Sequence, residues 1–314
     1  MSSMVASISD LYGCSRRKGL LFGIEVEVEF PSGTREVHLD DNLRSDWRIV
    51  ADGSLRNIGL EFISVPLPFP KARRSVHELL DYIDQFDPIN TNRTSIHVHM
   101  NVSDLTQDQV LNTIILYSLL EDYFESFCGD SRSGNLFCLG TSYQDHYLTA
   151  IQENLVASNA NSEARWFHSR TLSKYSALNI LSLRNGTLEF RSLPNNHNIS
   201  EVSNWLSALA VLRNVACKYK NVVKVLEDFD ENFKMFQANT LGIVKHLGEK
   251  EIDRSRCMKN FSNIYLTIDT YKEASNPKPI GKGRVKKKSK YLFRNELAMD
   301  DIQFDELDDF ELEE

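Results

Sequence analysis

Cysteine is scarce in this chain and shows no pairing pattern. The 314 residues include five cysteines, an odd number, and no two of them form a Cys-x-x-Cys motif. This argues against a disulfide framework and against a zinc ribbon, and unpaired thiols suit a reducing compartment. We therefore expect a cytoplasmic protein.

Long hydrophobic runs and a surplus of basic charge are also missing. No stretch approaches the roughly 18 apolar residues that a membrane helix needs, and the first residues lack the pattern of a secretory signal. The net charge of −8 comes from residues 300–314, which hold nine acidic residues and no basic ones, whereas the rest holds 36 basic and 35 acidic residues. A nearly neutral body gives no footprint for nucleic acid, so we expect neither nucleic acid nor a membrane as a partner.

Hydrophobic patterning predicts an α+β fold. Alternating residues indicate strands over 20–30, 60–65 and 95–102, and the Asn185–Gly186 turn predicts a hairpin over 177–193. Helical spacing indicates helices over 72–86, 103–127, 145–156, 202–229 and 233–247. We expect a flexible leader over 1–18, a folded domain over 19–272, and a basic linker with a disordered acidic tail over 273–314.

Several of the predicted strands carry reactive side chains on one face. Residues two apart in a strand point to the same side. The residues in question are Glu25, Glu27 and Glu29, then Glu61, then His97 and His99, and finally Glu189 and Arg191. Each set alone is typical of a solvated strand, and Glu29 could equally be a solvated strand end. Their apolar opposite faces, however, predict one shared sheet packed on helices, with the polar groups gathered on the other face.

Such a gathering of carboxylates needs a counter-charge. Neighbouring carboxylates repel one another, and burial without partners would force some of them to bind protons. A divalent cation removes this problem, and carboxylates with one or two imidazoles favour Mg²⁺ or Mn²⁺ over zinc. Arg191, beside a metal-binding carboxylate, suits bidentate binding of a phosphate or carboxylate.

Four motifs follow one another along the chain in an order that resembles a known family. They are Gly23-Ile-Glu25-Val-Glu27; Asp52-Gly-Ser54-Leu with Gly59-Leu-Glu61 and Pro66; Ser95-Ile-His97-Val-His99 followed by Ser103-Asp-Leu-Thr106; and Tyr175-Ser-Ala-Leu-Asn179 with Gly186-Thr-Leu-Glu189-Phe-Arg191. Together they resemble the amidoligases of the glutamine synthetase-like carboxylate–amine ligase superfamily, over roughly residues 20–215.

This resemblance implies a fold and a reaction. The fold is a curved antiparallel sheet with helices on its convex face, and the concave face holds ATP and two Mg²⁺ ions. The reaction is ATP-dependent amide bond formation through an acyl-phosphate intermediate, in which metal ions and cationic side chains neutralise the transferring phosphoryl group. The domain over 19–272 would then be the catalytic domain.

The resemblance also implies roles for individual residues. The expected metal ligands are Glu25, Glu27, Glu61, His97 and Glu189. The expected nucleotide contacts are His99, Lys174, Tyr175, Asn179 and Arg191, and the expected catalytic residues are Asp52, His99 and Arg191. Arg165 and Arg170 are candidates for further phosphate contacts, with a surface role equally open.

The substrates and the charged tails leave alternatives open. The carboxylate and the amine could belong to a peptide, a protein side chain or a small metabolite, and residues from 222 onward match no motif of the family. Phe304, Leu307, Phe310 and Leu312 could let the acidic tail dock on a protein partner, or the tail could only improve solubility. Two other functions compete with the ligase: an idle ligase-fold protein that binds or assembles partners through its tails, and a metal-dependent hydrolase that needs no nucleotide.

Overall fold

The computed structural model describes residues 6–141, 144 and 174–275. The helix predicted over 145–156, Arg165, Arg170, the basic linker and the acidic tail lie outside the described residues. The described strands are β1 (Leu21–Phe30), β2 (Trp47–Ala51), β3 (Ile58–Ser64), β4 (Leu67–Pro68), β5 (Ser95–Asn101), β6 (Leu178–Asn179) and β7 (Thr187–Pro194). The α-helices are α1 (Ile8–Tyr12), α2 (Asp41–Arg44), α3 (Phe69–Ile83), α4 (Gln107–Cys128), α6 (Ile199–Ala216), α7 (Val222–Asp230), α8 (Phe233–His246) and α9 (Arg254–Ser275), and the 3₁₀ helices are η1 (Asp84–Phe86) and η3 (Ile180–Asn185).

The seven strands form one open antiparallel sheet, which confirms the predicted α+β class. The strand order is β2-β3-β1-β5-β7-β6, and the short β4 pairs with the start of β1. Strand β5 pairs with β1 on one side and with β7 on the other. These three strands are neighbours in the sheet although they are far apart in sequence. This order places the three most polar strands side by side at the centre of the sheet.

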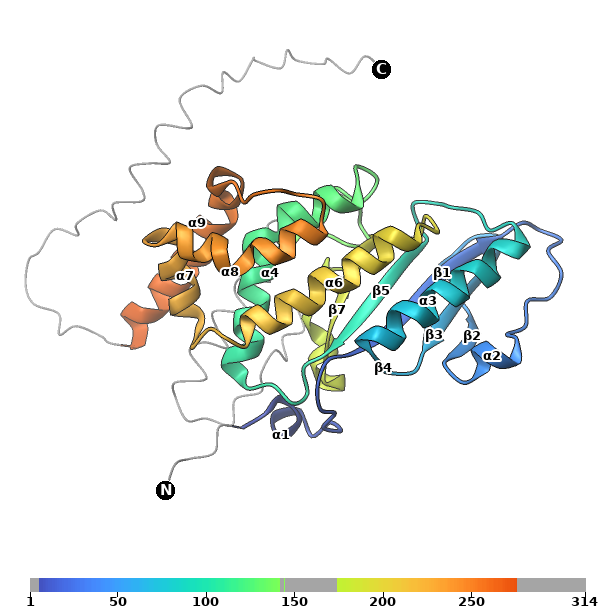
Figure 1. Ribbon diagram of the computed structural model, residues 1–314, viewed down its shortest axis with the longest axis horizontal. Coiled ribbons are helices and arrows are strands. Elements are labelled where there is room, and N and C mark those ends of the chain that lie inside the picture. Colours follow the sequence, from blue (N-terminus) through green and yellow to red (C-terminus); the bar gives the residue numbers. More distant parts are fainter. Residues whose placement is uncertain (1–5, 142–143, 145–173, 276–314) are drawn as a thin grey trace, which may run out of the picture. The chain divides into compact units, whose positions relative to one another are not determined.

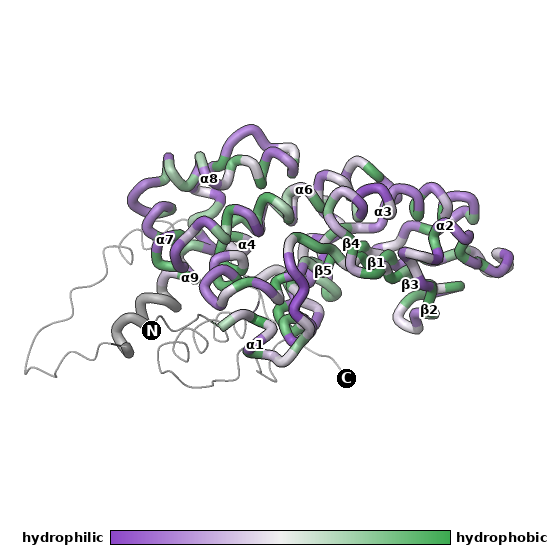
Figure 2. Tube along the Cα trace, turned by 60° about the horizontal axis from the view of Figure 1, so that its bottom comes forward, coloured by the Kyte–Doolittle hydropathy of each residue, from purple (hydrophilic) through white to green (hydrophobic). Residues whose placement is uncertain are grey.

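Helices cover one face of the sheet and bury its apolar residues. Helix α3 packs on β1 and α4 packs on β7, and α6 lies between the two helices and contacts both (Figure 1). The strand residues that face these helices are fully buried, among them Val26, Val98 and Phe190. Figure 2 shows the hydrophobic residues gathered along β1 and β5. Since burying a large apolar side chain stabilises a fold by roughly 1.5–3 kcal/mol, this face supplies most of the stability of the sheet.

The predicted hairpin over 177–193 is wrong in its first half. β6 has only two residues, and the chain then turns into η3 before it enters β7. The Asn179 side chain starts this turn by accepting a hydrogen bond from the backbone N–H of Leu181 (3.0 Å), and Gly186 ends it at φ +75°. A Cβ at Gly186 would lie 2.7 Å from Cβ of Ser103, so the position admits only glycine.

The helix predicted over 202–229 is two helices, α6 and α7. The side chain of Asn112 donates hydrogen bonds to the carbonyls of Ala216 (3.1 Å) and Tyr219 (2.9 Å), which satisfies the end of α6. Asn221 then caps α7 by accepting from the N–H of Lys224 (3.1 Å). Helix α9 has no counterpart in the sequence prediction.

Part of the predicted leader is packed against the domain. α1 lies within residues 1–18, and Ile8 in this helix is fully buried. All five cysteines are free thiols. Within the residues described, no helix combines the length and the apolar character that crossing a bilayer requires.

Candidate active site

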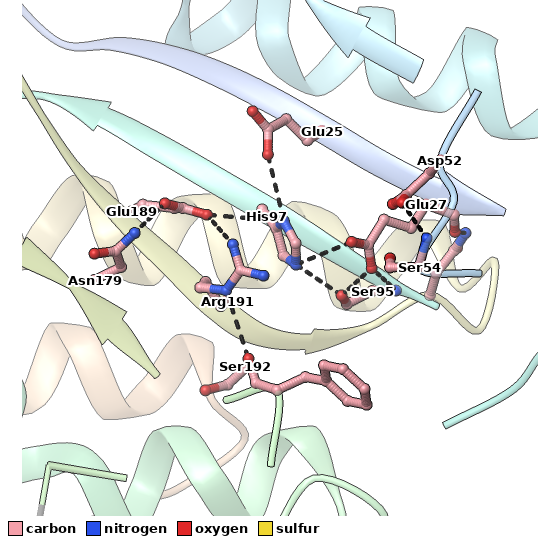
Figure 3. Close-up of polar contacts among 12 residues, drawn as sticks. Glu25, Glu27, Asp52, Ser54, Ser95, His97, Asn179, Glu189, Arg191 and Ser192 are labelled. Atoms are coloured by element: carbon pink, nitrogen blue, oxygen red, sulfur yellow. Dashed lines mark hydrogen bonds and ion pairs between the residues drawn. The ribbon is translucent and has the colours of Figure 1, made fainter. Parts of the chain in front are cut away.

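Strand register gathers the acidic and imidazole side chains on the face of the sheet opposite the helices. Glu25 of β1 lies directly opposite His97 of β5, and Glu27 lies opposite Glu61 of β3. On the other side of β5, His99 lies opposite Glu189 of β7. Directly opposite residues point to the same face, so the alternation predicted from the sequence brings these groups together (Figure 3).

His97 lies at the centre of this cluster and is buried. Its Nδ1 is 3.3 Å from Oε2 of Glu25 and 3.8 Å from Oε1 of Glu189. Its Nε2 is 2.8 Å from Oγ of Ser95, which also donates a hydrogen bond to Glu27 (2.5 Å). One imidazole thus contacts carboxylates from both neighbouring strands, as Figure 3 shows.

Two sets of three side chains have donor atoms close enough to share one cation each. The first set is Glu25, Glu61 and His97, and the second is Glu25, His99 and Glu189; within each set the ligand atoms lie within 4.8 Å of one another. In the second set, Nε2 of His99 is buried and lies 3.2 Å from Oε1 of Glu25 without forming a hydrogen bond. A ring nitrogen directed at carboxylates in this way fits a metal ligand, and the mixture of carboxylate and imidazole accommodates Mg²⁺ or Mn²⁺.

Cationic side chains line the same cavity as the carboxylates. The cavity has a volume of about 230 Å³. It is lined by Glu25, Glu27, Asp52, Ser54, Glu61, Arg93, Ser95, His97, Phe137, Lys174, Tyr175 and Arg191. Arg191 forms an ion pair with Glu189, which also accepts from Asn179 (2.6 Å) and Ser182 (2.9 Å). The cavity therefore combines carboxylates with cationic side chains, which suits a metal-bound anion.

The electrostatics separate the carboxyl groups into two kinds. Burial and the negative charges of Glu25, Glu27 and Asp52 raise the pKa of Glu61 to about 7. Burial would also raise the pKa of Glu25, but its contacts with His97 and His99 outweigh this and hold the pKa below its usual range. Burial and repulsion by neighbouring carboxylates thus together raise the pKa of Glu61, and a bound cation would relieve the repulsion.

Charge pairing also acts on the second set. Burial opposes ionisation of Glu189, yet the positive charges of His99 and Arg191 lower its pKa. The pKa of His99 is raised because its contacts with Glu25 and Glu189 outweigh the effect of burial. A metal ion bound here would replace the proton of His99 as the positive charge between the two carboxylates.

The structure brings all eleven of the predicted site residues into this one region. Eight line the cavity, and His99, Asn179 and Glu189 lie next to it through the contacts described above. Glu27 lines the cavity but belongs to neither set of three. Glu29, the extra acid of β1, is fully buried, accepts from the N–H of Arg56 (3.0 Å) and does not line the cavity.

Four cavity residues received no role in the sequence prediction, although Ser54 and Ser95 lie within its motifs. Ser95 shares a strand face with His97, so the same alternation could have identified it. Ser54 lies two residues after Asp52 and donates its backbone N–H to that side chain (2.8 Å). Arg93 and Phe137 come from loops without a pattern, and they pack together with the Arg93 guanidinium 5.6 Å from the ring centre.

Two larger cavities lie elsewhere, at about 500 Å³ beside α7 and α8 and about 610 Å³ beside α2. Each mixes charged and apolar surface, but neither lies beside a group of three metal-binding side chains among the described residues. Among the described residues, the groups that could hold a cation therefore lie at the smaller cavity of about 230 Å³.

One of two comparisons with known proteins identifies a family for this chain. A search of curated proteins finds no match. A comparison with protein-family models matches residues 21–212 to a family described as "Putative amidoligase enzyme". The match covers more than half of the chain and contains every residue that the sequence prediction assigned to the site. The chain therefore belongs to this amidoligase family, which supports a ligase-type function.

Proposed function

We propose that the chain is an ATP- and Mg²⁺-dependent carboxylate–amine ligase with a glutamine synthetase-like fold and a catalytic domain over residues 19–272. In this reaction the substrate carboxylate takes the γ-phosphoryl group of ATP and ADP leaves. The amine then attacks the acyl carbon, loses a proton and displaces phosphate, which leaves an amide. The observation that carries this proposal is a cavity lined both by Arg191 and by the cation-binding set Glu25, Glu61 and His97. The second set, Glu25, His99 and Glu189, lies beside it.

The proposed roles follow the charges of the cavity. Glu25, Glu61 and His97 would hold one Mg²⁺, and Glu25, His99 and Glu189 a second, with Mn²⁺ as a substitute. When bound, the ions neutralise the charge that develops on phosphate oxygens. Arg191, Arg93 and Lys174, which also line the cavity, bind phosphate or substrate carboxylate. At about 230 Å³ the cavity is smaller than the roughly 300–1,000 Å³ of typical ligand pockets, which suits a triphosphate end rather than a whole nucleotide.

Asp52 is the proposed base for the amine. It lines the cavity in a loop between β2 and β3, and its side chain accepts the backbone N–H of Ser54. A carboxylate at this position attracts a cationic amine and can take its proton during attack. The proposed substrates are a carboxylate and an amine of a peptide, protein or small metabolite, the proposed location is the cytoplasm, and the acidic tail is a proposed docking segment for a protein partner.

Ligand-induced stabilisation tests the site before any substrate is known. Thermal unfolding is measured with Mg²⁺, with ATP, with both and with neither, in the wild type, in Glu189→Gln and in Glu78→Gln. Ligand at about 100 times its Kd stabilises the folded state by roughly 2.7 kcal/mol. We expect a joint stabilisation in the wild type and in Glu78→Gln, because Glu78 is exposed on α3, and its loss in Glu189→Gln.

Turnover then separates a ligase from the alternatives. Hydroxylamine serves as the amine and a panel of carboxylates as the other substrate, and formation of ADP and hydroxamate is measured. A ligase gives both products in equal amounts. Metal-dependent hydrolysis without nucleotide would favour the hydrolase, and joint binding of ATP and Mg²⁺ without turnover on any carboxylate would favour an idle binding protein.

A further inference from the structure

Strand β7 contains a β-bulge at the position where Arg191 enters the site. Ile96 of β5 pairs with Leu193, and Val98 pairs with Phe190, so that Arg191 and Ser192 together lie opposite the single residue His97. A bulge redirects side chains and disrupts the local ladder of backbone hydrogen bonds. The direction of the Arg191 side chain therefore depends on how this bulge is held.

Arg132 holds the bulge through its backbone carbonyls. Its guanidinium donates from Nη2 to the carbonyl of Arg191 (2.8 Å) and from Nε to the carbonyl of Ser192 (3.0 Å). A longer bond runs from Nη1 to the carbonyl of Asn92 (3.4 Å). Both residues of the bulge are thus bound by one planar side chain, whose fixed fork of donors suits two neighbouring acceptors.

Arg132 is buried without a carboxylate partner among the described residues. The residue is 3% exposed, and no carboxylate of the described residues lies within ion-pairing distance of it. By contrast, Arg213 is also buried but forms an ion pair with Asp104 (2.8 Å). Burying an unpaired charge is costly, and a neutral side chain would serve ordinary packing better. Its hydrogen bond to the carbonyl of Arg191 places a second positive charge close to that residue.

Arg132 also connects the bulge to the wall of the cavity. It belongs to the loop that follows α4, and its own carbonyl accepts the N–H of Asn135 (3.2 Å). The same loop places Phe137 in the cavity lining, and the carbonyl of Phe137 accepts a long hydrogen bond from Nε of Arg191 (3.5 Å). Arg132 therefore binds the backbone of the bulge that carries Arg191, and it lies in the loop whose Phe137 carbonyl contacts the Arg191 guanidinium.

We propose that Arg132 is a positioning residue for anion binding by Arg191: it fixes the bulge of β7 and the Phe137 loop so that the Arg191 guanidinium faces the cavity. This role rests on the proposed function, because it takes phosphate of MgATP as the anion. Arg132 itself does not line the cavity. It acts through Arg191, so its removal should matter only while Arg191 is present.

A double-mutant cycle tests this dependence. The affinity for MgATP is measured by calorimetry in the wild type, Arg132→Met, Arg191→Met and the double variant. We expect Arg132→Met to weaken binding about tenfold, Arg191→Met to weaken it at least as much, and the double variant to match Arg191→Met within about twofold. Arg132→Lys keeps the charge but loses the fork, and we expect an intermediate loss. Multiplying losses in the double variant would overturn the proposal.

The matched control is Arg213→Met, which removes an equally buried arginine from another part of the fold. We expect this variant to keep MgATP affinity within about twofold. We expect Arg132→Met, Arg132→Lys and Arg213→Met to keep the Mn²⁺ affinity measured without nucleotide. A parallel loss of Mn²⁺ affinity in Arg132→Met would mean general damage to the site, and would overturn the specific role. If Arg132→Met fails to fold, Arg132→Lys replaces it in the cycle and is measured alone and combined with Arg191→Met.

Hydrogen exchange tests whether Arg132 fixes the bulge of β7, and this test does not require MgATP to bind. A wild type that binds no MgATP would refute the proposed function instead. The N–H of Arg191 donates to the carbonyl of Ala177 (2.9 Å), so its exchange reports on the bulge. We expect Arg132→Met or Arg132→Lys to speed exchange over residues 190–193 at least tenfold, with β1 unchanged, and Arg213→Met to leave residues 190–193 unchanged. Unchanged exchange in the Arg132 variants would overturn the proposal.

Discussion

The two faces of the sheet use alternate residues of the same strands and have opposite physical roles. On the side of α3 and α4, Val26, Val98 and Phe190 are fully buried among apolar neighbours. On the other side, their sequence neighbours Glu25, His97 and Glu189 contact one another, in and beside one cavity. The first face resembles an ordinary protein core, whereas the second contains groups that cost free energy when they are buried.

The apolar face of the sheet therefore stabilises the fold, whereas the polar face holds the candidate ligand-binding groups. Apolar burial on one face supplies a surplus of stability that can support repulsion on the other. Substitutions on the two faces should therefore change different quantities. Those on the apolar face should lower the free energy of unfolding, and those on the polar face should change ligand binding and can even stabilise the unliganded protein.

The largest effect is expected on the apolar face, for Phe190→Ala. Its ring is fully buried and lies 5.3 Å from the ring of Tyr117. We expect a loss of about 3–5 kcal/mol in the free energy of unfolding, measured by urea denaturation, because the change leaves a cavity in the core. Thr187→Ala, on the polar face of the same strand, is the control and should cost about 1 kcal/mol. Similar losses in both variants would remove the distinction between the faces.

The next effect is a pH dependence of metal binding on the polar face. Glu61, with a pKa of about 7, holds a proton below that pH which a cation must displace. The affinity of the unliganded protein for Mg²⁺ should therefore rise about tenfold per pH unit below pH 7 and level off above it. His99 also has a raised pKa and adds to the slope in the same direction. Calorimetric titrations between pH 5.5 and 8.5 measure this.

Glu61→Gln is the control for this titration. This variant has no carboxyl proton at position 61 for the metal to displace. The plot of log Mg²⁺ affinity against pH should therefore be less steep by one unit per pH unit, and binding should be weaker at every pH. A wild-type affinity that does not change with pH, or an unchanged slope in Glu61→Gln, would show that Glu61 is not part of the metal set.

Much of this site follows from the sequence because strands alternate with period two. Glu25, Glu27, His97 and His99 share a face by spacing alone, and only the strand order was needed to bring them to Glu189. The motif order also placed the chain in the family that the comparison with family models finds over residues 21–212. In the structure, the predicted carboxylate and imidazole side chains do lie on one face of the sheet.

Long-range contacts account for what the sequence did not predict. Asn112 ends α6 from a different helix, about a hundred residues away in sequence, so no local pattern could place the break. The 3₁₀ turn after β6 depends on the side chain of Asn179, which a count of apolar residues does not register. Arg132 has no pattern around it, and its relation to Arg191 exists only because the bulge of β7 lies beside its loop.

A smaller effect of opposite sign is expected for the stability of Glu61→Gln without metal. The folded-state pKa of Glu61 is raised to about 7 from an ordinary value near 4.5, so the ionised carboxyl opposes folding. The wild type should lose stability as pH rises from about 4.5 to 7, and Glu61→Gln should not. At pH 8 the variant should be more stable by about 1 kcal/mol, because the carboxyl is half-buried and water screens the repulsion.

Saturating Mg²⁺ should reverse this order, because the cation stabilises only the protein that binds it well. Thermal unfolding of both proteins with and without Mg²⁺ at pH 8 measures the two differences. A Glu61→Gln variant that is less stable than the wild type in the absence of metal would contradict the repulsion inferred for the polar face.

The smallest effect is expected for Glu29→Gln, which marks where the functional face ends. Glu29 shares its strand face with Glu25 and Glu27, yet it is fully buried, holds the N–H of Arg56 and does not line the cavity. A glutamine oxygen can accept the same hydrogen bond, so we expect Mg²⁺ affinity within twofold of the wild type and a change in unfolding free energy below about 1 kcal/mol. Glu27→Gln, two residues earlier, should weaken Mg²⁺ binding several-fold because Glu27 lines the cavity. A tenfold loss of Mg²⁺ affinity in Glu29→Gln would show that Glu29 belongs to the metal-binding face. Equal losses of Mg²⁺ affinity in both variants would mean that lining the cavity does not distinguish Glu27 from Glu29, and that sharing the strand face is enough.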